Sequence, residues 1–220
     1  MRAPGGPTLP GVDVLAERCV VLGDAWDWWS VTLSELDAAT WHRSTRLAGW
    51  DVAALSAHAS LLVQGLSVLS VQPLPVEPSV RCARDMLRRF NAPGGLATTL
   101  AVGLAVLARQ QAAAMSSDAL VAQFGVTGPQ VIATIEASGP IVVEYFGNGT
   151  IPIVEAMSIA ILEAVVHGVD LCAAIGANAD SIPSEAVRHT VELLASIAEP
   201  VSFIDAATGR STDPVLPVLR

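Results

Sequence analysis

The chain has 220 residues, of which 52% are hydrophobic and only 15% are charged. This composition argues against a disordered chain, and the length fits one main domain with one sizeable core. The formal net charge of −9 argues against an extended phosphate-binding surface, because nucleic-acid binding depends on clustered Lys and Arg. We therefore expect neither nucleic acid nor an anionic membrane as a partner.

The cysteines and the N-terminus indicate a cytoplasmic protein. An odd number of widely spaced cysteines forms neither a disulfide framework nor a paired-cysteine metal motif, and we expect reduced core residues at Cys19, Cys82 and Cys172. Residues Met1–Gly11 lack the basic and apolar regions of a signal peptide. The long apolar stretch Ile151–Ala174 contains several ionisable side chains, so we do not expect it to span a membrane.

The first half of the chain predicts two long helices separated by a loop. From Val12 to about Ser30, large residues recur at helical spacing, with Leu15, Cys19, Leu22, Trp26 and Trp29 on one stripe. The segment Leu36–Gly49 lacks a clean period and reads as a loop. Asp51 is well placed to cap a second helix that runs to about Ser70.

The second half predicts further helices and one short ambiguous segment. Prolines make residues 71–79 a stiff connector, and helical sequence resumes near Val80, with a break at residues 91–95. Helices are then expected at Leu96–Met115, within Asp118–Ser138, from Thr150 to about Gly176 and over Ser181–Ile197. Residues 141–146 read as a strand or a buried turn, so the chain is predicted to be mainly helical.

Three side chains on two of these helices could carry chemistry. His58 lies in register with Leu55 and Leu62, on the stripe that should face the core. Glu163 and His167 are four residues apart on the apolar central helix, which places them on one face. Two imidazoles and one carboxylate match an open divalent-metal site, with Zn as the first choice and Ni or Fe as alternatives.

The same residues also have a simpler interpretation. Glu163 and His167 can form an ordinary intrahelical ion pair, and His58 can be a core histidine with a hydrogen-bond partner. Arg43 and Arg46 in the preceding loop could contact an anionic substrate or cofactor, but we expect them to be solvated at the surface. His42 is expected to be exposed in the same loop, and His189 receives no role.

Two separated segments resemble the mycothiol-dependent maleylpyruvate isomerase family, part of the DinB-like superfamily. The first is Leu33–Leu62, with Trp41, Thr45, Gly49-Trp50-Asp51-Val52 and Ala57-His58. The second is Glu163–Leu171, which resembles the family's Glu-x-x-x-His metal motif followed by an Asp. The resemblance implies an all-α, DinB-like four-helix bundle over about residues 12–176. The sequence itself predicts that residues 177–220 form a short helical C-terminal extension, because they are too few for an independent domain.

Carried over to this chain, the resemblance implies that His58, Glu163 and His167 are ligands of one divalent metal. Asp170 would orient a ligand imidazole, although a solvent-facing or helix-end role for it is also open. The resemblance further implies that the metal activates the thiol of a low-molecular-weight cofactor, mycothiol. The partners expected are therefore a small-molecule electrophile or thiol, and a homodimer is an open alternative for the oligomeric state.

The expected activity is a metal- and thiol-dependent transferase or isomerase. Isomerases of this family carry a separate C-terminal domain that contributes to substrate binding, and here only residues 177–220 follow the central helix. Thiol transfer to an electrophile is therefore as open as isomerisation. The alternative is a non-catalytic or degenerate bundle that binds a metal or small ligand, or that serves as a structural or dimerisation module.

Overall fold

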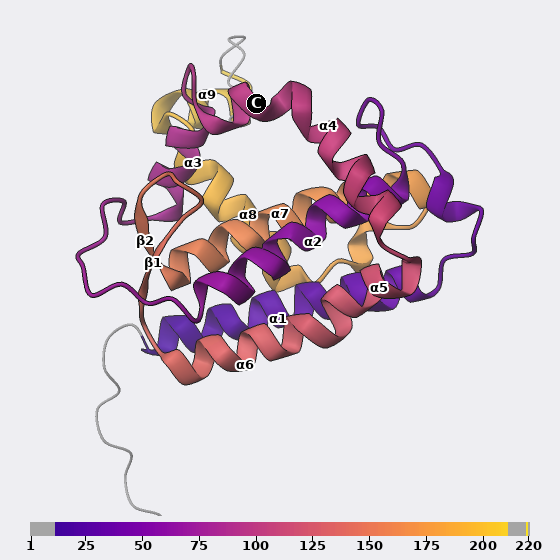
Figure 1. Cartoon of the computed structure of the whole chain (residues 1–220). Helices are drawn as coiled ribbons and strands as arrows, with labels where there is room; N and C mark the ends of the chain where they lie inside the picture. Colours follow the sequence, from indigo (N-terminus) through magenta and orange to yellow (C-terminus); the bar gives the residue numbers. More distant parts are fainter. Residues whose placement is uncertain (1–11, 211–218, 220) are drawn as a thin grey trace, which may run out of the picture.

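A computed structural model of the chain describes residues 12–210 and residue 219. Its centre is a ring of four helices (Figure 1), comprising α1 (Val12–Ser34), α2 (Val52–Leu69), α6 (Gly128–Ser138) and α7 (Ile153–Ile175). Helix α1 packs against α6 and α7, and α2 packs against the same two helices. The prediction of an all-α four-helix bundle is therefore confirmed.

Indole side chains fill the centre of this bundle, as expected for Trp26 and Trp29. Both are almost fully buried. The Trp29 ring stacks on Phe124 with centroids 5.2 Å apart, and its Nε1–H donates to the Ala164 carbonyl oxygen at 2.9 Å. Phe124 lies in a π-helical turn (Gln123–Thr127) that joins α5 (Ser117–Ala122) to α6. Helix α1 is thus tied to α7 by packing and by a buried hydrogen bond.

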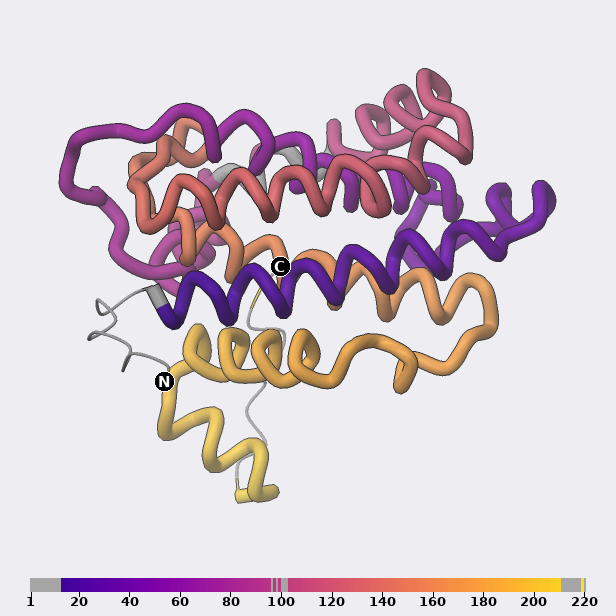
Figure 2. Tube along the Cα trace, turned by 90° about the horizontal axis from the view of Figure 1, so that it is seen from below, coloured from indigo at the N-terminus to yellow at the C-terminus, as the bar shows by residue number. Residues whose placement is uncertain are grey.

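The other helices cover the outside of the ring. The described helices there are α3 (Ala83–Asn91), α4 (Leu96–Ala114), α8 (Ser184–Ile197) and α9 (Pro200–Ala207). Helix α4 packs against α2, while α8 packs against α7, α1 and α3. Figure 2 shows α8 alongside α1 and α7, with α9 turning away from the bundle. Helix α8 therefore packs directly against two of the central helices, α1 and α7.

A small hairpin replaces part of a predicted helix. Strands β1 (Val142–Glu144) and β2 (Thr150–Pro152) pair antiparallel, with Val143 opposite Ile151. Of the two alternatives for residues 141–146, a strand or a buried turn, the strand forms at residues 142–144. The predicted helix start at Thr150 is wrong, because residues 150–152 pair with β1 and α7 begins at Ile153. Helix α8 similarly begins at Ser184 rather than Ser181, because residues 179–181 form a separate 3-10 turn.

Two helices of the described part are long and apolar enough to cross a membrane, namely Val52–Leu69 and Ile153–Ile175. Most of each is buried inside the bundle, which is how the core helices of a folded domain are expected to lie. The three cysteines are free, with Cys19 and Cys172 buried and Cys82 partly exposed. The core prediction thus holds for Cys19 and Cys172 and fails for Cys82.

Candidate metal centre

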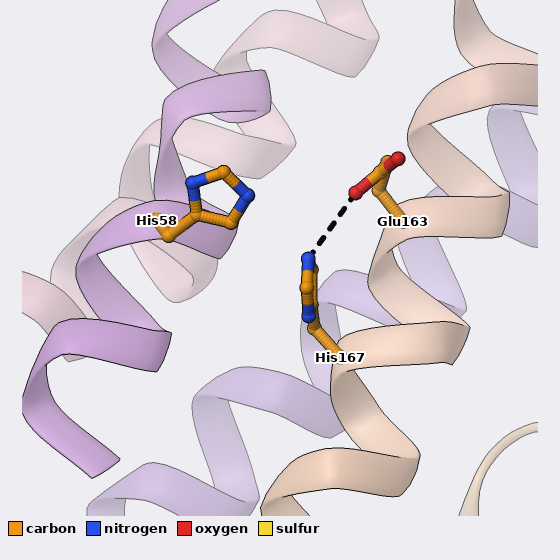
Figure 3. A group of neighbouring side chains, drawn as sticks. All are labelled: His58, Glu163 and His167. Atoms are coloured by element: carbon orange, nitrogen blue, oxygen red, sulfur yellow. Dashed lines mark ion pairs between the residues drawn. The ribbon is translucent and has the colours of Figure 1, made fainter. Parts of the chain in front are cut away.

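The three predicted ligands meet between α2 and α7. His58 lies near the middle of α2, and Glu163 and His167 lie one turn apart on α7. Helix α2 begins where predicted, since the Asp51 carboxylate accepts from the Ala54 N–H at 2.8 Å. Figure 3 shows the imidazole of His58 directed across the interface toward the two α7 side chains. The structure therefore brings together residues that are more than 100 positions apart in the sequence.

The spacing of the donor atoms suits a single small cation. One ligand atom from each of the three residues lies within 4.8 Å of the other two, and we call this group the His–Glu–His triad. The His167 Nε2 atom is 3.2 Å from a Glu163 carboxylate oxygen. The imidazole rings of His58 and His167 have centroids 5.0 Å apart and are nearly perpendicular. All three side chains are partly exposed, so solvent or a small ligand has access.

The surroundings of the His58 side chain bear on the choice between the two interpretations of the triad. Among the described residues, the His58 imidazole has ring contacts with Trp50 and His167 but no hydrogen bond. The described residues thus offer no hydrogen-bond partner to support the core-histidine interpretation of His58, whereas the intrahelical ion pair of Glu163 and His167 that belongs to the same interpretation is present at 3.2 Å. A histidine that binds a metal needs a ring nitrogen with an available lone pair directed at the other ligands. The His58 imidazole meets this requirement, because it faces the Glu163–His167 pair (Figure 3).

Charge is distributed unequally between the two histidines. Burial and the nearby His167 lower the pKa of His58 to about 4. Burial also opposes the charge on His167, but hydrogen bonds to Asp170 and Glu163 outweigh it and raise the pKa of His167 to about 9. Burial would raise the pKa of Glu163, yet hydrogen bonding and the charge of His167 lower it. The surroundings therefore favour the neutral form of His58 and the protonated form of His167.

Asp170 lies behind His167, on the side away from Glu163. Its carboxylate accepts from the His167 Nδ1–H at 3.0 Å, and its side chain is only 4% exposed. The alternative of a solvent-facing Asp170 is therefore wrong. The His167 Nδ1–H is used by this carboxylate, which directs Nε2 toward Glu163 and His58 and fixes the orientation that a metal ligand needs.

The loop before α2 contributes two residues that sequence reasoning did not assign to the site. The Arg46 guanidinium pairs with the second oxygen of Asp170, so this side chain is exposed as expected but also has a partner next to the triad. The Trp50 ring lies 4.9 Å from the His58 ring and 6.3 Å from the His167 ring, centroid to centroid. His42, in contrast, is exposed as expected, with 80% of its side chain accessible.

The loop is held in place at several points. Gly49 adopts a positive φ of 80°, a conformation that glycine allows at little cost. Its carbonyl oxygen accepts from Arg109 of α4 at 3.1 Å. Arg43 donates to the Ile175 carbonyl at the end of α7, at 3.5 Å. These contacts keep Trp50 over the two imidazoles and Arg46 beside Asp170.

The donor chemistry of the triad fits a divalent transition metal. Imidazole nitrogen and carboxylate oxygen are ligands of Zn²⁺, Ni²⁺ and Fe²⁺, and three protein ligands leave coordination positions for a water or substrate. The buried carboxylate behind His167 is the outer partner that ligating histidines usually have. The residues present therefore fit the group, and their metal-binding role stays a prediction.

Comparison with known proteins is consistent with this arrangement. The family model described as the mycothiol maleylpyruvate isomerase N-terminal domain matches residues 22–172, which include every member of the triad. No curated protein and no solved structure matches the chain significantly. Because the matched region covers more than half of the chain, the protein belongs to the mycothiol maleylpyruvate isomerase N-terminal domain family.

Proposed function

We propose that the His–Glu–His triad binds one divalent metal ion, with zinc as the first choice and nickel or iron as alternatives. The His58 imidazole carries this proposal, since one of its ring nitrogens faces the Glu163–His167 pair (Figure 3) and the ring has no hydrogen-bond partner among the described residues. The carboxylate offsets part of the charge of the ion, the two imidazoles supply neutral nitrogen donors, and the partly exposed site leaves room for a further ligand.

The proposed activity is a thiol-dependent transfer or isomerisation in which the thiol comes from a small molecule. When bound, the metal lowers the pKa of a coordinated thiol and thereby supplies a thiolate nucleophile. The chain itself offers no suitable thiol on α7, because Cys172 is buried and burial raises its pKa. Membership of a family named for mycothiol supports mycothiol as the thiol.

The protein's own residues would have three separate tasks in this reaction. His58 and His167 would supply neutral nitrogen donors, and Glu163 would supply a negative oxygen donor. Asp170 would hold the His167 imidazole through its Nδ1–H. Trp50, which is buried against both imidazoles, would restrict their rotation and exclude water from one side of the site. An electrophile would enter from the exposed side of the triad.

The test is consumption of mycothiol in the presence of a small electrophile such as chlorodinitrobenzene. Zinc-loaded wild-type protein should consume thiol faster than the uncatalysed reaction, with conjugate formed in equal amount. His58→Ala should abolish the acceleration, while the matched control His42→Ala, which changes an exposed histidine outside the triad, should keep it. Bound zinc without any acceleration over a panel of electrophiles would instead support the non-catalytic alternative.

A further inference from the structure

A charged pair connects the loop before α2 to the helix that carries two triad residues. Arg46 and Asp170 are 124 positions apart in the sequence. The Asp170 side chain is only 4% exposed, whereas that of Arg46 is 54% exposed. The guanidinium therefore reaches from the protein surface to a buried carboxylate. A buried carboxylate is costly unless it is paired and hydrogen-bonded.

The two oxygens of Asp170 have different partners. One accepts from the Nε–H of Arg46, and the other accepts from the Nδ1–H of His167 at 3.0 Å. With both oxygens engaged, the carboxylate cannot rotate without breaking one of these bonds. Its orientation in turn determines the plane of the His167 ring and the direction of the Nε2 atom, which lies 3.2 Å from Glu163. Arg46 thus acts on the triad through one intermediate residue.

We propose that Arg46 is a positioning residue for the metal centre, acting through Asp170 to fix the His167 imidazole. This inference rests on the proposed function, because it assumes that the triad binds a metal. The loop of residues 43–51 would thereby influence the affinity for the metal, which the exposure of Arg46 alone does not suggest. Without the guanidinium, His167 is the remaining charged partner of Asp170. The carboxylate can then rotate more freely, and the His167 imidazole loses part of its fixed orientation.

The chain offers a matched control in the same loop. Arg43 is also exposed, and it also contacts α7, but it donates to the Ile175 backbone carbonyl at 3.5 Å. Its contact therefore anchors the loop without engaging Asp170. Substituting Arg43 tests whether loss of any loop–helix contact disturbs the site. Substituting Arg46 tests the specific connection to the carboxylate.

The experiment measures the zinc dissociation constant by competition with a chromophoric chelator. Arg46→Gln should weaken zinc binding by about tenfold, the lower end of the effect of losing an outer partner of a ligating histidine. Arg46→Lys, which keeps the charge, should recover part of the loss, and Arg43→Gln should bind zinc as the wild type does. Thermal melting of each metal-free variant identifies any that are unfolded.

A double-mutant cycle tests the route through Asp170. Asp170→Asn should weaken zinc binding on its own, and adding Arg46→Gln in that background should have little further effect, because the intermediate is already lost. Full additivity would overturn the inference, as would wild-type affinity in Arg46→Gln. Failure of the wild-type protein to bind zinc at all would be a different result, since it would refute the proposed function itself.

Discussion

The unequal charge of the two triad histidines predicts a pronounced pH dependence of metal binding. His167 has a pKa raised from 6.5 to about 9, so it is protonated at neutral pH and its proton must leave before Nε2 can bind a cation. His58 has a pKa lowered to about 4 and stays neutral over the same range. Affinity should therefore rise with pH until about pH 9, and His167 should dominate the change.

The size of the effect follows from these values. Between pH 7 and pH 8 a histidine with a pKa near 9 gives about a ninefold gain in affinity, whereas an unperturbed histidine gives about 1.3-fold. At pH 7.5 binding should release about one proton, against about 0.1 for the unperturbed group. The contrast arises because the Asp170 and Glu163 carboxylates both favour the protonated imidazole.

Calorimetry in two buffers with different ionisation enthalpies counts the protons released. Cd²⁺ is a useful second probe beside Zn²⁺, because water bound to cadmium is less acidic and contributes fewer protons of its own. Asp170→Asn, which removes one of the two carboxylates, should reduce the release at pH 7.5. A release close to 0.1 in the wild type with both metals would refute the assignment of the extra proton to His167.

Three substitutions test the packing that positions the triad, each measured by urea denaturation of the metal-free protein. Asp51→Ala removes the cap of α2 and should lower the free energy of unfolding by about 1 kcal/mol. Asp51→Asn should retain most of the stability that the cap contributes, because Asn also caps helices. Leu55→Ala opens a cavity in the core and should cost about 2 to 5 kcal/mol. Trp29→Phe loses the bond to Ala164 and leaves part of the buried indole volume empty, so it should cost about 1 to 3 kcal/mol. Unchanged unfolding midpoints would contradict these assignments.

The helices were predictable because their signals are local. Apolar residues at helical spacing define the buried side of α1, and the Asp51 cap defines the start of α2. The hairpin was predictable only in part. Residues 150–152 have a sequence compatible with a helix start, but they pair with residues 142–144, and that pairing depends on where the two segments meet in the fold.

The candidate site was predictable as a set of residues but not as a network. The spacing of Glu163 and His167 and the core register of His58 identify the triad from the sequence, together with the resemblance to the family. The pairing of Arg46 with Asp170 joins an exposed loop to a helix that is distant in the sequence. Neither a hydrophobic periodicity nor a sequence motif predicts a contact between segments so far apart, and a lone arginine in a polar loop is usually solvated.

The most direct test of the account is the metal content of the protein purified without a His-tag, measured by elemental mass spectrometry. The account predicts about one equivalent of a divalent transition metal per chain, and loss of that metal in variants that replace any triad member by Ala. Absence of bound metal in the wild type, even after incubation with zinc, nickel or iron, would contradict it.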